Sequence, residues 1–177
     1  MGWQDVSEEE ILQANIEKYN NEHIVSYYRD FKEPRYAYDE YDVIFGATLQ
    51  ALAARSEQKL RVADMCGGAG KSAFIFKKLI PQAEVTLVDL SGKMLDIARQ
   101  RIREENIGEI EVVQEDVFTF LKRDRQFDII VFSSAIHHFK DPVNLLNSAA
   151  KRLSDDGVII TIAEPNILTK TKRYKTL

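Results

Sequence analysis

The residues with the clearest chemical potential form a glycine-rich turn after a short apolar run. The segment reads Val62-Ala63-Asp64-Met65-Cys66-Gly67-Gly68-Ala69-Gly70-Lys71-Ser72. Glycine lets the backbone turn sharply and lets a ligand approach the main chain without a Cβ atom in the way. In open α/β sheets, ligands bind beyond the carboxyl ends of the strands, where the strand order reverses. The segment therefore predicts a ligand-binding turn between a strand and a helix.

Carboxylates follow two further apolar runs, and a pair of histidines follows a third. Asp89 comes directly after the run 85–88, Asp116 comes shortly after the run 110–114, and His137 and His138 lie beyond the run 127–133. We expect these runs to be parallel strands whose carboxyl ends meet at one edge of a sheet. The acids would then gather around the glycine turn.

Three kinds of nucleotide-binding turn compete for this pattern. Gly70-Lys71-Ser72 resembles the end of a triphosphate-binding loop, but Met65 stands where that motif needs a glycine, and the turn is too short to hold phosphates. Gly68-x-Gly70-x-x-Ala73 with Asp89 fits a loose dinucleotide pattern, so an NAD-binding Rossmann oxidoreductase stays open as an alternative. Asp64 favours a third interpretation, because an acid before the turn repels a pyrophosphate and attracts a cationic ligand.

The third interpretation is a resemblance to a known family. Asp64, Cys66, Gly68 and Gly70 match motif I of the class I S-adenosylmethionine-dependent methyltransferases, and the similarity extends over about Asp39–Pro165. The segment resembles their small-molecule branch, which includes the ubiquinone and menaquinone biosynthesis methyltransferases. The resemblance implies that S-adenosylmethionine is the cofactor and S-adenosylhomocysteine the product. It also implies direct in-line transfer of a methyl group to a small-molecule acceptor.

The resemblance further implies roles for individual residues. Asp89 is expected to accept hydrogen bonds from both ribose hydroxyls, since a carboxylate has two acceptor oxygens. Leu90 and Met94 are expected to pack on the adenine, and Asp116 to accept from its amino group. The full set of expected cofactor-binding residues is Tyr36, Tyr41, Asp64, Cys66, Gly67, Gly68, Gly70, Asp89, Leu90, Met94, Asp116, Val117 and Ser133.

Some of these residues have a structural interpretation beside the functional one. Tyr36 and Tyr41 fit aromatic packing as well as contact with the methionine end of the cofactor. Cys66 is best interpreted as a small packing residue and not as a nucleophile. His137 and His138 are candidate bases for deprotonating an acceptor, but they fit a loop-shaping role as well. We predict no bound metal.

The elements that must position these residues alternate between strands and helices. The strands expected from apolar runs are 60–64, 84–89, 110–114, 127–133 and 157–162, and the helices between them are 72–80, 91–103, 118–123 and 142–153. Near-continuous apolar strands are typical of a parallel sheet that is buried on both faces. We therefore predict a Rossmann-like, doubly wound α/β fold with helices on both faces.

The residues before the first strand look helical. Ser7 and Glu10 form a capping box, and a second helix is expected over Asp42–Arg55. We predict that residues 1–58 form an N-terminal helical lid and residues 59–177 the cofactor-binding core of a single domain.

Composition sets limits on location and partners. The net charge of −4 disfavours a general nucleic-acid binder, and no apolar run approaches the ~20 residues of a membrane-spanning helix. A single cysteine, Cys66, excludes an internal disulfide and fits a cytoplasmic location.

The end of the sequence leaves room for five strands, so strands six and seven of the family are expected to be missing. The apolar strand 157–162 would then form an exposed edge. Such an edge favours a homo-oligomer or a partner chain that covers it. A non-catalytic S-adenosylmethionine-binding domain therefore stays open as a further alternative.

Overall fold

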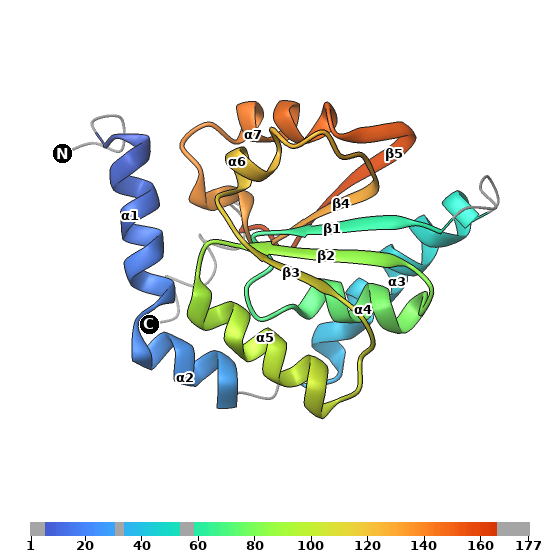
Figure 1. Cartoon of the computed structure of the whole chain (residues 1–177), viewed down its shortest axis with the longest axis horizontal. Coiled ribbons are helices and arrows are strands. Elements are labelled where there is room, and N and C mark those ends of the chain that lie inside the picture. The colour runs from blue at the N-terminus through green and yellow to red at the C-terminus, as the bar shows by residue number, and fades with distance from the viewer. Residues whose placement is uncertain (1–5, 31–33, 54–58, 166–177) are drawn as a thin grey trace, which may run out of the picture.

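One parallel sheet of five strands forms the centre of the computed structural model, which describes residues 6–30, 34–53 and 59–165 (Figure 1). The strands are β1 (Arg61–Met65), β2 (Glu84–Asp89), β3 (Glu111–Gln114), β4 (Phe127–Ser133) and β5 (Leu153–Ile162). Their order is β3-β2-β1-β4-β5, and every neighbouring pair is parallel. The predicted doubly wound sheet is confirmed. Its order reverses between β1 and β4, where such sheets bind ligands.

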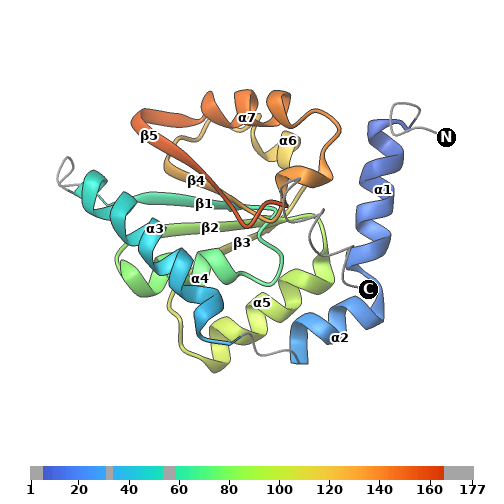
Figure 2. The same cartoon turned by 180° about the vertical axis from the view of Figure 1, so that it is seen from behind.

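Helices cover both faces of the sheet. Figures 1 and 2 show α3 (Tyr36–Ala53), α4 (Lys71–Leu79) and α5 (Gly92–Glu104) on one face. The short α6 (Val117–Phe120) and α7 (Pro142–Ala150) lie on the other. Alternate residues of a strand belong to the two apolar cores on opposite faces of the sheet. Val62 packs with the first group of helices and Ala63 with the second. Burial on both faces explains why the strand sequences are apolar almost throughout.

Two N-terminal helices lie beside this core. They are α1 (Glu8–Tyr19) and α2 (Glu22–Asp30). The predicted capping box is confirmed, since Glu10 N donates to Ser7 Oγ over 3.1 Å and Ser7 N donates to Glu10 Oε2 over 2.7 Å. No residue of α1 is fully buried, so this helix is attached to the core by few contacts.

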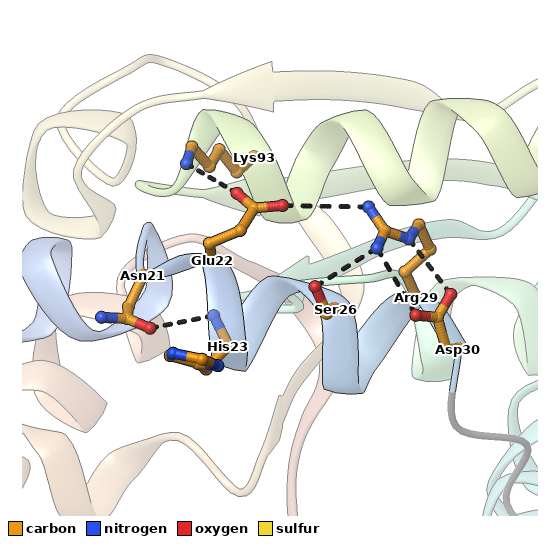
Figure 3. A network of polar contacts seen from close by, with 7 residues as sticks. All are labelled: Asn21, Glu22, His23, Ser26, Arg29, Asp30 and Lys93. Carbon is orange, nitrogen blue, oxygen red and sulfur yellow. Dashed lines mark hydrogen bonds and ion pairs between the residues drawn. The ribbon is translucent and has the colours of Figure 1, made fainter.

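An exposed polar network links α2 to the start of α5 (Figure 3). Lys93 Nζ lies 3.2 Å from Glu22 Oε2, and Arg29 Nη1 lies 3.9 Å from Glu22 Oε1. Arg29 also pairs with Asp30, with Nε 3.1 Å from Oδ1. Exposed ion pairs of this kind contribute only ~0–1 kcal/mol each, so the network orients α2 more than it stabilises the fold.

Several element boundaries differ from the predicted ones. Helix α3 begins at Tyr36, earlier than the predicted Asp42, and the predicted end at Arg55 lies outside the described residues. Strand β5 begins at Leu153 instead of Gly157, because Phe127 pairs with Leu153 before the register shifts. Helix α7 therefore ends at Ala150. Within the described residues, no helix is both long enough and apolar enough to cross a membrane.

Candidate functional site

The glycine turn after β1 depends on left-handed backbone at several positions. Cys66, Gly68 and Gly70 have φ values of 56°, 53° and 87°. Gly67 N donates to Val88 O over 3.1 Å, which ties the turn to the neighbouring strand. A Cβ atom on Gly67 would collide with the side chains of Leu87 and Asp64. The turn is therefore held close to the carboxyl ends of β1 and β2.

Asp64 supports this turn from beneath. Its side chain is 0% exposed, and Oδ2 accepts a hydrogen bond from Ala73 N over 2.9 Å. Oδ1 has no hydrogen-bond partner among the described residues. Burial raises the pKa of this carboxyl from 3.8 to about 7. Asp64 does not line the crevice, so it joins β1 to α4 instead of facing a ligand directly as the sequence had suggested.

Asp89 is held at the end of β2 by two backbone amides. Its Oδ2 accepts from Gly68 N and its Oδ1 accepts from Ser91 N, both over 2.8 Å. Burial raises the pKa of the Asp89 carboxyl, while these hydrogen bonds oppose the rise. Each carboxylate oxygen can accept a further hydrogen bond. The pair of oxygens is therefore fixed in orientation and suited to a vicinal diol.

A large cavity of about 1710 Å³ extends from this turn to α1 and α2. It exceeds the ~300–1,000 Å³ typical of a pocket for one small ligand, so it has room for two reactants. The expected site residues that line it are Tyr41, Cys66, Gly67, Gly68, Asp89, Leu90, Met94, Asp116, Val117, Ser133 and His138.

Four expected site residues do not line the cavity, each for a physical reason. Asp64 lies beneath the turn, and Gly70 faces the ring of Phe74, whose Cζ would lie 2.6 Å from a Cβ atom. Tyr36 begins α3 and is 75% exposed. His137 turns its Nδ1 toward Glu164.

Asp116 and Cys66 are structural as well as cavity-lining residues. Asp116 caps α6, because its Oδ2 accepts from Thr119 N over 2.8 Å. Burial raises the pKa of the Cys66 thiol well above its ordinary value, with the Asp89 carboxylate adding to the effect. A neutral thiol is a poor nucleophile, which agrees with its interpretation as a packing residue.

The end of the cavity near β4 contains a cluster of aromatic and polar side chains. Tyr41 is 5% exposed, and its hydroxyl lies 2.7 Å from Ser133 Oγ. Lys71 Nζ stands 4.3 Å from the centre of the Tyr41 ring and 4.7 Å from that of Tyr38. It also donates to Ala37 O over 3.1 Å. This cluster fastens α3 to the glycine turn.

The two histidines have different surroundings. His138 Nε2 hydrogen bonds to the Tyr19 hydroxyl over 2.9 Å, and burial lowers the pKa of His138 to about 4. It is therefore neutral at pH 7 and a weak proton acceptor. His137 Nδ1 lies 2.8 Å from Glu164 Oε2. Because a carboxylate only accepts, this contact leaves Nε2 of a neutral His137 as the acceptor nitrogen.

Sequence reasoning missed Glu164, which lies just beyond β5. Its Oε1 accepts from Ala135 N and Ile136 N over 2.7 and 3.0 Å, and its Oε2 accepts from His137 N over 3.3 Å. The carboxylate thus fixes the loop that follows β4. An acid at the end of a strand was the available signal, since Asp89 occupies the same kind of position.

Lys71 and Tyr19 were also missed as cavity-lining residues. Lys71 was considered only as part of a triphosphate-binding motif, and Tyr19 was not among the candidate site residues. Their contacts are with segments far away in the sequence, so no local pattern indicated them.

A parallel sheet of this order, with a glycine turn and acids at the strand ends, defines an α/β domain that binds a ligand at its switch point. The model of the methyltransferase domain family matches residues 62–157. The chain belongs to this family, and the predicted class I methyltransferase with a Rossmann-like sheet is confirmed.

Curated relatives and solved structures agree with this assignment. The chain is 29% identical over 120 residues to the ubiquinone/menaquinone biosynthesis C-methyltransferase UbiE of Pseudomonas fluorescens (66% of this chain, 47% of the relative). It is 31% identical over 116 residues to the demethylmenaquinone methyltransferase of Thermotoga maritima (64% and 47%). The chain thus spans about half the length of these relatives.

Two solved structures show the same fold at low sequence identity. The plantazolicin methyltransferase BpumL, in complex with a pentazolic desmethylPZN analog and SAH, matches with a TM-score of 0.70 at 16% identity, covering 97% of this chain and 66% of that one. The magnesium protoporphyrin IX methyltransferase ChlM from Synechocystis, with bound SAM, matches with a TM-score of 0.61 at 15% identity, covering 81% and 72%.

Proposed function

We propose that the chain binds S-adenosylmethionine in this cavity and transfers its methyl group to a small-molecule acceptor. The observation that carries the proposal is the arrangement of Asp89, whose two oxygens are oriented by Gly68 N and Ser91 N at the edge of the glycine turn. The turn itself has no room for a side chain at Gly67. A fixed pair of acceptor oxygens beside the glycines that line the cavity fits an adenosyl group.

Different residues along the cavity would contact different parts of the cofactor. Asp89 would hold the ribose, with Leu90 and Met94 against the adenine and Asp116 near its amino group. Ser133, at the end of β4, would lie at the methionine part. This assignment follows the sheet order, because β2 and β4 lie on opposite sides of β1.

The chain contributes to the reaction mainly through alignment. The bound cofactor supplies an electrophilic methyl group on a sulfonium, so the protein must hold an acceptor in line with it and exclude water. Helices α1 and α2, from the segment 1–58, contribute lining residues such as Leu12, Tyr19 and Tyr28, and we infer that they act as the lid. His138 lines the cavity but is bonded to α1 through Tyr19, and His137 faces Glu164 and does not line the cavity, so the proposal assigns the base to neither histidine.

Calorimetry tests the cofactor assignment. We expect wild type to bind S-adenosylmethionine and not NAD. Asp89→Ala should weaken that binding at least tenfold, since a lost charged acceptor costs ~1.5–3 kcal/mol. Asp96→Ala, at a side chain on α5 that is 75% exposed, is the matched control and should bind like wild type. Binding of NAD in place of S-adenosylmethionine would support an oxidoreductase instead.

We further propose that a second copy of the chain or a partner protein binds along the outer side of β5. We also propose that the protein is located in the cytoplasm. Among the described residues, strand β5 is at the end of the sheet order, and Thr161 on it is exposed. A strand with one unpaired side favours association with another chain. Gel filtration with light scattering should therefore give a mass above that of one chain, and a monomer at high concentration would contradict self-association.

A further inference from the structure

Glu164 joins the end of β5 to the loop that follows β4. Its Oε1 accepts hydrogen bonds from Ala135 N and Ile136 N over 2.7 and 3.0 Å. Its Oε2 accepts from His137 N over 3.3 Å, so three consecutive backbone amides point at one carboxylate. The Glu164 side chain is only 18% exposed. Hydrogen bonds to a charged acceptor are about twice as strong as neutral ones, so these contacts restrain the loop firmly.

The loop begins in a backbone conformation that needs such a restraint. Ser134 and Ala163, the residues just after β4 and β5, have φ values of 53° and 58°. Residues other than glycine rarely adopt this left-handed region, and they keep it only where surrounding contacts hold them. Ser134 N donates to Ile162 O over 2.8 Å, and Glu164 follows directly after Ala163. This hydrogen bond and the Glu164 carboxylate together hold the two strand ends.

The restrained loop carries residues of the cavity wall. Ala135, His138 and Phe139 line the cavity, whereas His137 and Glu164 do not. His138 N donates to Ala135 O over 3.0 Å, within the same turn whose amides Glu164 binds. Glu164 therefore fixes the backbone that carries the His138 ring.

His138 in turn binds helix α1. Its Nε2 lies 2.9 Å from the Tyr19 hydroxyl, and its carbonyl oxygen accepts from Asn15 Nδ2 over 3.4 Å. Burial raises the pKa of Tyr19 to about 12, with Tyr28 and the Asp89 carboxylate adding to the effect, so the phenol stays neutral at pH 7. No residue of α1 is fully buried, so these two hydrogen bonds form a substantial part of its attachment to the core.

Tyr19 contacts both sides of the cavity. Its carbonyl oxygen accepts from Ser91 Oγ over 3.0 Å, and Ser91 N donates to Asp89 Oδ1 over 2.8 Å. Its side chain reaches the loop after β4 through His138. Helix α1 lies beyond the carboxyl ends of the strands (Figures 1 and 2). We therefore expect a cofactor at Asp89 to leave more slowly while Tyr19 keeps both contacts.

We propose that Glu164 is a positioning residue for the cofactor, because it places His138 so that α1 stays docked over the cavity. The inference rests on the proposed function, in which α1 is part of the lid. Glu164 does not line the cavity, so an effect of its loss on cofactor release must pass through the loop after β4.

The test measures how fast radiolabelled S-adenosylmethionine leaves the protein after an excess of unlabelled cofactor is added. Glu164→Gln keeps the shape of the side chain but removes its charge and one acceptor oxygen. It should speed release about fivefold or more, with the association rate little changed. Tyr19→Phe removes only the hydroxyl and should speed release about fivefold, as expected for one neutral hydrogen bond. Glu84→Gln, at the exposed start of β2, is the control and should release like wild type.

A double variant shows whether the two residues act in one chain of contacts. If Glu164 acts through His138 and Tyr19, then Glu164→Gln combined with Tyr19→Phe should release the cofactor about as fast as Tyr19→Phe alone. Hydrogen exchange of α1 without cofactor should be faster than wild type in both single variants, while that of α4 should not change. Effects on release that add fully in the double variant would overturn the proposal.

Chemical rescue separates the carboxylate contact from a general loss of stability. Glu164→Ala leaves the three amides open to a small anion, so added formate should slow the release of the cofactor toward the wild-type rate. Formamide, which has nearly the same size and no charge, should not. A lower melting temperature with unchanged release would mean that Glu164 only stabilises the loop, and the proposal would fail.

The outcome for Glu164 is distinguishable from that for the proposed function. If wild type does not bind S-adenosylmethionine, the proposed function fails. Hydrogen exchange of α1 in the protein without cofactor then still decides whether Glu164 controls the docking of this helix, and unchanged exchange in Glu164→Gln would contradict that control.

Discussion

Replacing Asp64 with asparagine should make the protein less sensitive to rising pH. Asp64 is 0% exposed, and burial is the main reason that its pKa rises from 3.8 to about 7. A raised pKa in the fold means that the unfolded chain loses this proton first. The folded state therefore becomes less favoured as the pH rises from the unfolded value toward 7, and the loss levels off above 7. Asparagine has nearly the same shape and never ionises.

The magnitude follows from the two pKa values. Each unit of difference corresponds to about 1.4 kcal/mol, so between pH 5 and pH 8 wild type should lose about 2–3 kcal/mol of unfolding free energy relative to Asp64→Asn. Urea unfolding followed by far-ultraviolet circular dichroism, at several pH values and without cofactor, measures this difference directly. Subtracting the two curves removes the titration of all other groups.

A matched exposed substitution makes the result interpretable. Asp96→Asn removes a carboxylate that is 75% exposed and paired with Arg99, so its curve should run parallel to that of wild type. If the Asp64→Asn curve is also parallel to wild type, Asp64 is already ionised in the fold at pH 5. The reasoning that burial controls this carboxyl would then be refuted.

Core packing and the contact between α1 and His138 allow three further tests. Gly67→Ala places a methyl group against Leu87 and Asp64, so it should cost ~1–3 kcal/mol in urea unfolding and abolish cofactor binding in calorimetry. Phe76→Ala removes a fully buried ring and should cost ~3–5 kcal/mol. Burial lowers the pKa of His138 from 6.5 to about 4, so α1 should dock most firmly above pH 6.5 and loosen as the pH falls toward 4. Hydrogen exchange of α1 measures this, and His138→Phe should remove the pH dependence.

Exposed or open positions supply the controls for these tests. A Cβ atom at Gly46 would meet no atom within 4 Å, and Leu79→Ala removes a side chain that is 40% exposed. Gly46→Ala and Leu79→Ala should therefore lower the free energy of unfolding only slightly. His23→Phe, at an exposed position, should leave the pH response of α1 intact. A pH response that persists in His138→Phe would mean that another group controls the docking of α1.

The sheet could be predicted from the sequence because its signals are local. The predicted strands 84–89 and 127–133 match β2 and β4 at both ends. Their residues are apolar on both faces, and a carboxylate or a serine marks the point where each strand leaves the core. The glycine turn was predictable for the same reason, because the glycines that adopt its left-handed backbone conformation, Gly68 and Gly70, are close together in the sequence.

Side-chain directions in the site could not be predicted, because they depend on segments that are far apart in the chain. His138 is bonded to Tyr19 on α1, and Lys71 is placed by the rings of Tyr38 and Tyr41 on α3. The early start of α3 was missed because its first residue, Tyr36, is 75% exposed and gives no apolar signal for a helix start.

The acids at the strand ends show how position alone leaves the role of a residue open. Asp64 is fully buried with one amide donor, so it ties β1 to α4 and tends to keep its proton. Asp116 accepts one hydrogen bond from a backbone amide of α6 and caps that helix. Glu164 accepts hydrogen bonds from backbone amides of the loop after β4. Asp89 differs because each oxygen has its own amide donor and the carboxylate still lines the cavity. The number of donors and the remaining access to the cavity, and not the strand-end position, are what single out Asp89 as the acid that we propose binds a diol.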